Sequence, residues 1–167
     1  MLETVTSKVV SAVAVLVLIG AVLGFFAIER GAMEEQEFRV MCASVGDALD
    51  SLSASNAEAR LNISFGEAPG LKLPSGFRGR SFDIEVRAGQ VIFRQDGLTA
   101  VRALVRGLHP WDPELLGNGT LAADPSALNG LDGLNRAFCT TSGKDFRAER
   151  TAVVLSGVLT YQTFVHS

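Results

Sequence analysis

The sequence has few of the residue types that most often carry chemistry. Its 167 residues include two histidines, two cysteines, one tryptophan and one tyrosine. Neither histidine lies at metal-ligand spacing from a cysteine, an acidic cluster or the other histidine, so we expect no metal and no cofactor. The chain also lacks an HExxH motif, a nucleophile elbow and a Walker-type loop. We therefore expect a protein that is not an enzyme.

The chain has no excess of positive charge. Its 15 lysines and arginines are outnumbered by 18 acidic residues, which disfavours a nucleic-acid partner. The charges are nevertheless uneven, because residues 29–50 carry six acids and two arginines whereas residues 78–106 carry six arginines and three acids. Two interpretations stay open. These are solvated faces of opposite sign, or they attract each other between neighbouring subunits.

Residues 9–28 contain no charged side chain, and their one polar side chain is Ser11. This stretch raises the mean hydropathy of the chain to +0.27. A helix of about 20 residues spans about 30 Å, the thickness of the hydrocarbon core of a bilayer. The stretch is longer than the apolar part of a secretory signal, about 7–15 residues, so it predicts a retained single-pass anchor in membrane lipid. The alternative is a buried helix in a soluble core.

A second helical pattern follows the apolar stretch. Apolar residues recur at spacings of three and four, which predicts an amphipathic helix that packs under a head domain: Phe38, Met41, Cys42, Val45, Ala48, Leu49 and Leu52. We expect this stem to continue the first helix as far as residue 57.

The pattern then changes to the alternation of strands. Strands are predicted at residues 59–65, 71–73, 82–87, 91–93, 98–105 and 151–165, with hairpin turns at Asp96-Gly97 and Ser156-Gly157. A short helix is the alternative for residues 98–105, because Arg102 and Arg106 are four apart. Residues 107–146 are predicted to be a long loop, with a helical turn or two near residues 128–138.

These patterns predict an α+β fold with a long N-terminal transmembrane and amphipathic helix, followed by a small, mostly antiparallel β-sheet head domain. The expected organisation is a short N-terminal segment (1–8), a transmembrane helix (9–28), a helical stem (29–57) and a β-rich extracytoplasmic head domain (58–167).

Two features favour placement of the head outside the cytoplasm. Cys42 and Cys139 both follow the apolar stretch and form an even pair, which suggests a disulfide in an oxidising compartment. Two buried free thiols are the alternative. Asn62 and Asn118 each begin an N-glycosylation acceptor triplet, also after the apolar stretch.

Trp111 lies in the run His109-Pro110-Trp111-Asp112-Pro113. A tryptophan in such a loop either packs the loop onto a sheet or anchors a ligand or a partner, and both interpretations stay open here. His109 and His166 are expected to be structural, either solvated or hydrogen-bonded.

The start of the apolar stretch carries a resemblance. The run from Lys8 to Val13 is similar to the basic, small, Val-Ser-Pro-Val motif that begins the hydrophobic helix of archaeal type IV pilins. Lys8, Val10, Ser11 and Val13 match this motif, whereas Val9 replaces a glycine or alanine and Ala12 replaces the proline. The resemblance implies processing by a prepilin peptidase within Lys8-Val9-Val10, and a helix that packs with its copies in a filament core.

Small residues in the same helix would let neighbouring helices approach closely: Ser11, Ala14, Gly20 and Gly24. A helix that faces lipid without a partner is the alternative. The function expected from these features is a non-enzymatic, pilin-like surface or filament subunit, with copies of itself or other pilin-like subunits as partners. The alternative is a single-pass anchored, extracytoplasmic binding or accessory module of a membrane complex.

Overall fold

The computed structural model describes residues 2–66, 69–116, 125–132 and 136–167, and within them the side chains from residue 15 onward except those of residues 127 and 132. The chain divides into two compact units, Met1–Glu37 and Phe38–Ser167. One helix, α1 (Leu2–Ala54), begins in the first unit and ends in the second. It stops three residues before the predicted end, where the Ser55 amide donates to the carbonyl of Leu52 and the Ser55 hydroxyl caps the following turn.

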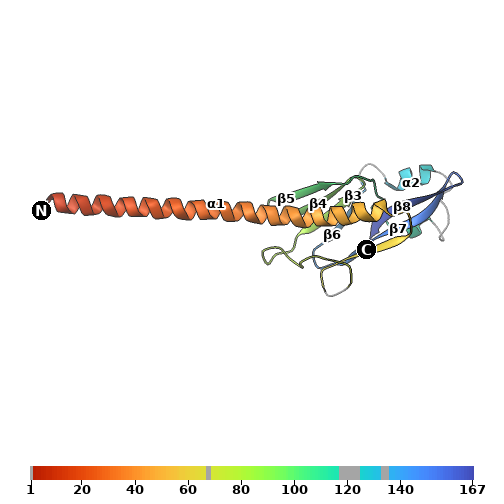
Figure 1. Ribbon diagram of the computed structural model, residues 1–167, viewed down its shortest axis with the longest axis horizontal. Helices are drawn as coiled ribbons and strands as arrows, with labels where there is room; N and C mark the ends of the chain where they lie inside the picture. The colour runs from red at the N-terminus through yellow and green to blue at the C-terminus, as the bar shows by residue number, and fades with distance from the viewer. Residues whose placement is uncertain (1, 67–68, 117–124, 133–135) are drawn as a thin grey trace. The chain divides into compact units, whose positions relative to one another are not determined.

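The second unit, called the head below, contains two four-stranded sheets (Figure 1). The first has the order β2-β1-β7-β8, with β1 (Ala59–Ser64), β2 (Leu71–Lys72), β7 (Phe146–Leu155) and β8 (Val158–His166). The second has the order β5-β4-β3-β6, with β3 (Asp83–Arg87), β4 (Gln90–Gln95), β5 (Leu98–Ala103) and β6 (Phe138–Thr141). All pairs are antiparallel except β1 with β2. The predicted α+β class is confirmed, with two sheets.

Two hairpin turns match the sequence prediction. Asp96 and Gly97 have φ angles of 41° and 86°, and Ser156 and Gly157 have φ angles of 52° and 81°. Positive φ at both central residues is the geometry of a type I′ turn, whose twist matches that of the flanking strands. These turns set the registers Gln95↔Leu98 and Leu155↔Val158.

The main core forms where the last third of α1 meets both sheets. The predicted amphipathic face of α1 is buried there, through Phe38, Cys42, Val45, Leu49 and Leu52. The Phe38 ring has its centroid 5.1 Å from that of Phe77 and 5.8 Å from that of Phe82. Both sheets contribute to the core, which includes Ile63, Ile84, Val91 and Val165. The helix thus holds the two sheets around one core.

A smaller apolar cluster lies on the other face of the first sheet. Trp111, Leu128, Val153 and Phe164 form it. Phe164 is next to Val165 in β8, and successive side chains of a strand point to opposite faces, so Phe164 points away from the main core. The first sheet therefore has α1 on one face and the segment around Trp111 and Leu128 on the other.

The prediction of a long loop over residues 107–146 is wrong in part. The helical turns predicted near residues 128–138 are confirmed in part by α2 (Pro125–Asp132). The short helix η1 (Pro113–Leu116), the strand β6 and the first residue of β7 were not predicted. Residues 98–103 form a strand, so the helical alternative is wrong, because each residue of β5 pairs with β4.

Candidate functional site

The clearest surface feature of the first unit is its exposed apolar side chains. Between residues 15 and 28 the large apolar residues are exposed by 45% at Val22 to 75% at Ile28. An α-helix has 3.6 residues per turn. The five consecutive exposed residues from Val15 to Ile19 therefore place apolar side chains on all sides of the helix. Within the residues described with side chains, Val15–Ala54 is the one helix long and apolar enough to cross a membrane. This helix is compatible with a membrane anchor.

Two of the four predicted packing residues can be examined. A Cβ added at Gly20 or at Gly24 would meet no atom within 4 Å. The two glycines are four apart and so lie on one side of the helix. The side chains of Ser11 and Ala14 lie outside the described part, as do those at the predicted processing site, Lys8, Val9 and Val10; there only the helical backbone is described.

The uneven charges are partly satisfied within the chain. Arg102 Nη2 lies 2.8 Å from Asp47 Oδ1 and 3.6 Å from Asp50 Oδ2, and these contacts raise the pKa of the Arg102 guanidinium. Asp50 also accepts a hydrogen bond from the amide of Val105 at 2.9 Å. Part of the attraction between the acidic stem and the basic sheet thus operates inside one head, between α1 and β5. Attraction between neighbouring subunits stays a prediction.

The predicted disulfide between Cys42 and Cys139 is wrong, because both cysteines are free. Cys42 is 1% exposed in the main core, with Sγ 3.5 Å from the carbonyl oxygens of Val91 and Ala100. Burial raises the pKa of its thiol to about 11. Cys139 is exposed and pairs with Glu85, which points away from the core side of the sheet. The second sheet therefore separates the two thiols.

Glu85 forms a charged network on the outer face of the second sheet. Its two carboxylate oxygens accept hydrogen bonds from Arg87 on the same strand and from Arg94 on β4. Burial alone would raise the pKa of Glu85, but the two guanidinium groups outweigh it and lower the pKa below its ordinary value. The network orders the outer face of the sheet.

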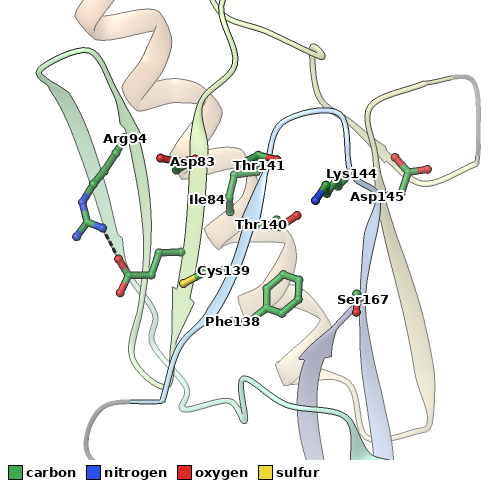
Figure 2. Close-up of a pocket in the computed structure, with 11 residues that line it drawn as sticks. Asp83, Ile84, Arg94, Phe138, Cys139, Thr140, Thr141, Lys144, Asp145 and Ser167 are labelled. Carbon is green, nitrogen blue, oxygen red and sulfur yellow. Dashed lines mark hydrogen bonds and ion pairs between the residues drawn. The ribbon is translucent and has the colours of Figure 1, made fainter.

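A groove of about 610 Å³ runs along β6, and Figure 2 shows its lining. Acidic and basic side chains both line the groove. Asp83 and Arg94 come from β3 and β4, and Lys144 and Asp145 come from the turn after β6. Cys139 also lines the groove. Among the described residues, no group of three or more histidine, cysteine or acidic side chains could hold a metal ion. Apolar side chains, Ile84 and Phe138, line the groove together with these charged groups, and no catalytic constellation is evident among the described side chains.

The predicted glycosylation residues are far apart in the chain and only one can be placed. Asn62 is exposed on β1 and lines a smaller pocket of about 310 Å³ next to the groove. Ser64, the third residue of its triplet, is 1% exposed. Asn118 lies outside the described residues. Use of either acceptor stays a prediction.

Trp111 is 4% exposed and belongs to the smaller apolar cluster. Its ring packs edge-on against Phe164, with centroids 4.9 Å apart. Trp111 thus packs the loop onto the sheet, and its interpretation as a surface that contacts a partner is contradicted by this burial. His109 lies beside it, with Nε2 3.2 Å from the Gln162 side-chain oxygen, as expected for a structural histidine.

One group of ionisable residues was missed by the sequence analysis. His166 is buried between Asp112 and Glu149. Asp112 and Glu149 are 37 positions apart in the chain, and Glu149 and His166 are 17 apart. No local pattern links the three residues. Only the pairing of β7 with β8 and the folding of the segment around Trp111 bring them together.

No protein-family model, curated protein or solved structure matches this chain.

Proposed function

We propose that the chain is a non-enzymatic, pilin-like subunit held in the membrane by its N-terminal helix, with the β-rich head on the extracytoplasmic side. The exposed apolar surface between Val15 and Ile28 is the observation that carries this proposal. Leaving one large apolar side chain in water instead of burying it costs about 1.5–3 kcal/mol. A continuous surface of such side chains needs lipid or other helices around it.

The helix offers a specific place for a second helix. Gly20 and Gly24 leave a strip without side chains on one side of α1. In lipid, helices associate mainly through close packing and interhelical hydrogen bonds, and small residues four apart allow the backbones to approach. We propose that Gly20 and Gly24 face a copy of this chain or another pilin-like subunit. Packing through Ser11 and Ala14 stays a prediction, because at 3.6 residues per turn these positions fall on another side of the helix and would face a different neighbour.

The resemblance at Lys8–Val13 adds the expectation of processing. If a prepilin peptidase cuts within Lys8-Val9-Val10, the mature helix begins with its apolar part and can enter a filament core. If the chain is not cut, the same helix remains a membrane anchor. Both forms keep the head outside and use the helix for assembly.

Coexpression with an archaeal prepilin peptidase tests the filament form. We expect a loss of the N-terminal residues up to the processing site, read by intact-protein mass spectrometry. An active-site variant of the peptidase is the control and should leave the mass unchanged. An unchanged mass with the active peptidase contradicts the filament form. Release of the protein from membranes by alkaline carbonate contradicts the anchored form as well.

A double variant, Gly20→Leu with Gly24→Leu, tests helix packing. We expect it to stay in the membrane fraction, because leucine is apolar, but to lose chemical cross-linking between subunits. The matched control is Val22→Leu with Leu23→Val, which keeps both glycines and should cross-link as the wild type does. Equal cross-linking of the two double variants contradicts assembly through the glycine strip.

A further inference from the structure

A separate layer covers the outer face of the first sheet. We call residues 107–116 and 125–132 the covering segment. Its apolar anchors are Trp111 and Leu128, which pack on Val153 and Phe164. Backbone hydrogen bonds join its start to β8, because the His109 amide donates to the Thr163 carbonyl and the Val165 amide donates to the His109 carbonyl, each at 2.8 Å.

His166 lies where the covering segment meets the sheet, and it is 4% exposed. Its Nδ1 is 3.3 Å from Asp112 Oδ2, which belongs to the covering segment. Its Nε2 is 3.5 Å from Glu149 Oε1, which belongs to β7. Neither ring nitrogen has a hydrogen-bond partner by geometry among the described residues. The imidazole is therefore enclosed between two carboxylates, one on each layer.

The protonation state of the His166 ring determines how many of the two carboxylates it can bond. A protonated imidazole donates from both nitrogens, so it can bond both carboxylates at once. A neutral imidazole donates from one nitrogen and presents a lone pair at the other, so one carboxylate then faces a lone pair. We propose that protonation of His166 fastens the covering segment to the sheet, and that loss of the proton loosens it.

The neighbouring charges determine which contact is lost. On the first sheet, Arg60 of β1 lies 3.2 Å from Glu149 and stays charged, and Arg147 of β7 is the cross-strand partner of His166. From the covering segment, Asp112 faces the ring through Oδ2 while its Oδ1 accepts the Glu114 amide at 2.9 Å. When the ring is neutral, Glu149 keeps its ion pair with Arg60, whereas the attraction between the charged ring and Asp112 is lost. That is the contact between the two layers.

The direction of the pH dependence follows. Imidazole side chains generally change charge between about pH 5 and pH 8. The stabilising contact is present on the acidic side of this range and is lost as the pH rises through it. The covering segment is therefore held more tightly at the acidic end of this range than at its alkaline end.

Trp111 is the only tryptophan, and it sits in the covering segment, so its fluorescence reports the state of this layer. The experiment uses the full chain in detergent micelles, with acrylamide quenching measured from about pH 5.5 to about pH 8.5. We expect quenching to increase at least about threefold across this range, with a shift of the emission to longer wavelength. A constant quenching rate in the wild type contradicts the proposal.

Two variants test whether the pH-dependent step in Trp111 quenching comes from His166. His166→Gln should show high quenching at every pH, because glutamine carries no charge. His109→Gln is the matched control: this ring lies 5.5 Å from Trp111 but faces Gln162, so the step in quenching should remain. A step that persists in His166→Gln, or vanishes in His109→Gln, contradicts the proposal.

A second variant covers the case in which His166→Gln does not fold. Asp112→Asn keeps His166, Glu149 and Arg60 but removes the charge on the covering segment. We expect the step in quenching to fall by half or more, with an unchanged far-ultraviolet circular dichroism spectrum. A step of wild-type size in Asp112→Asn shows that the fastening does not depend on this ion pair and overturns the proposal.

Discussion

There is no room for a methyl group between Gly46 of α1 and Arg102 of β5. A Cβ built on Gly46 would lie 2.3 Å from Cγ of Arg102 and 3.2 Å from its Cβ. The aliphatic part of Arg102 therefore crosses α1 directly at this glycine, and its guanidinium continues to Asp47. No pattern in the sequence identifies Gly46 as the position where a strand approaches the helix closely.

We expect Gly46→Ala to destabilise the head. Alanine gains about 1 kcal/mol in helix propensity, but overpacking costs about 1–3 kcal/mol and Arg102 must leave Asp47. The net loss should be about 1 kcal/mol in the free energy of unfolding, measured by urea titration with Trp111 fluorescence. Gly31→Ala is the control, because a Cβ there meets no atom within 4 Å. Higher stability of Gly46→Ala would contradict the tight contact.

The two thiols should differ in reactivity. Cys139 is exposed, whereas Cys42 is buried and its pKa is raised to about 11, so little of its reactive thiolate forms near neutral pH. We expect a maleimide to label one cysteine per chain in the folded protein and two after denaturation, counted by mass spectrometry. Cys139→Ser should abolish the native labelling. Different mobility with and without a reducing agent would instead indicate a disulfide within the chain.

Phe38 should be the most sensitive position of the helical face that enters the head. It is 1% exposed and contacts the rings of Phe77, Phe82 and Phe93. Phe38→Ala should lower the free energy of unfolding by about 3–5 kcal/mol, through lost burial and the cavity left behind. The matched control is Phe26→Ala, since Phe26 is 60% exposed. It should leave unfolding of the head unchanged, as followed by Trp111 fluorescence.

Removal of the Glu85 charge should make the free energy of unfolding of the head depend less on pH in acidic solution. The pKa of Glu85 is lowered in the folded state, so its ion pairs stabilise the fold above the pKa of the unfolded chain. This contribution is lost as the pH falls through the lowered pKa. We expect Glu85→Gln to cost about 1 kcal/mol near neutral pH, because solvent screens the half-exposed arginines.

The difference between Glu85→Gln and the wild type should shrink toward zero in strong acid, in unfolding titrations at stepped pH. Asp83→Asn is the control on the same strand face, because Asp83 is exposed. A difference that grows on acidification would have the wrong sign for a lowered pKa.

The long helix and most strands were predictable because their side-chain spacing reflects burial. Phe38, Val45 and Leu49 recur at helical spacing because one side of α1 faces the core, and Ile84 and Val86 alternate with charged residues because one face of β3 does. The hairpin turns were predictable because Asp-Gly and Ser-Gly tolerate positive φ. In these cases the cause of the structure is local.

The features that were missed depend on residues far apart in the chain. The four residues of β6 lack a strong alternating pattern, and they form a strand because β3 offers an edge to pair with. The disulfide prediction counted cysteines on one side of a membrane but could not tell on which face of a sheet each would lie. Trp111 and His166 likewise acquire their surroundings from partners that the local sequence does not identify.

The hydrogen bond from Ser53 of α1 to Thr163 of β8 joins residues 110 positions apart. The main core likewise includes both Phe38 and Val165, so it is complete only when β8 is in place. Domains dominated by such distant contacts fold slowly compared with helical bundles, because long loops must be closed first. The amphipathic face of α1 is therefore covered completely only when the C-terminal strand is in place.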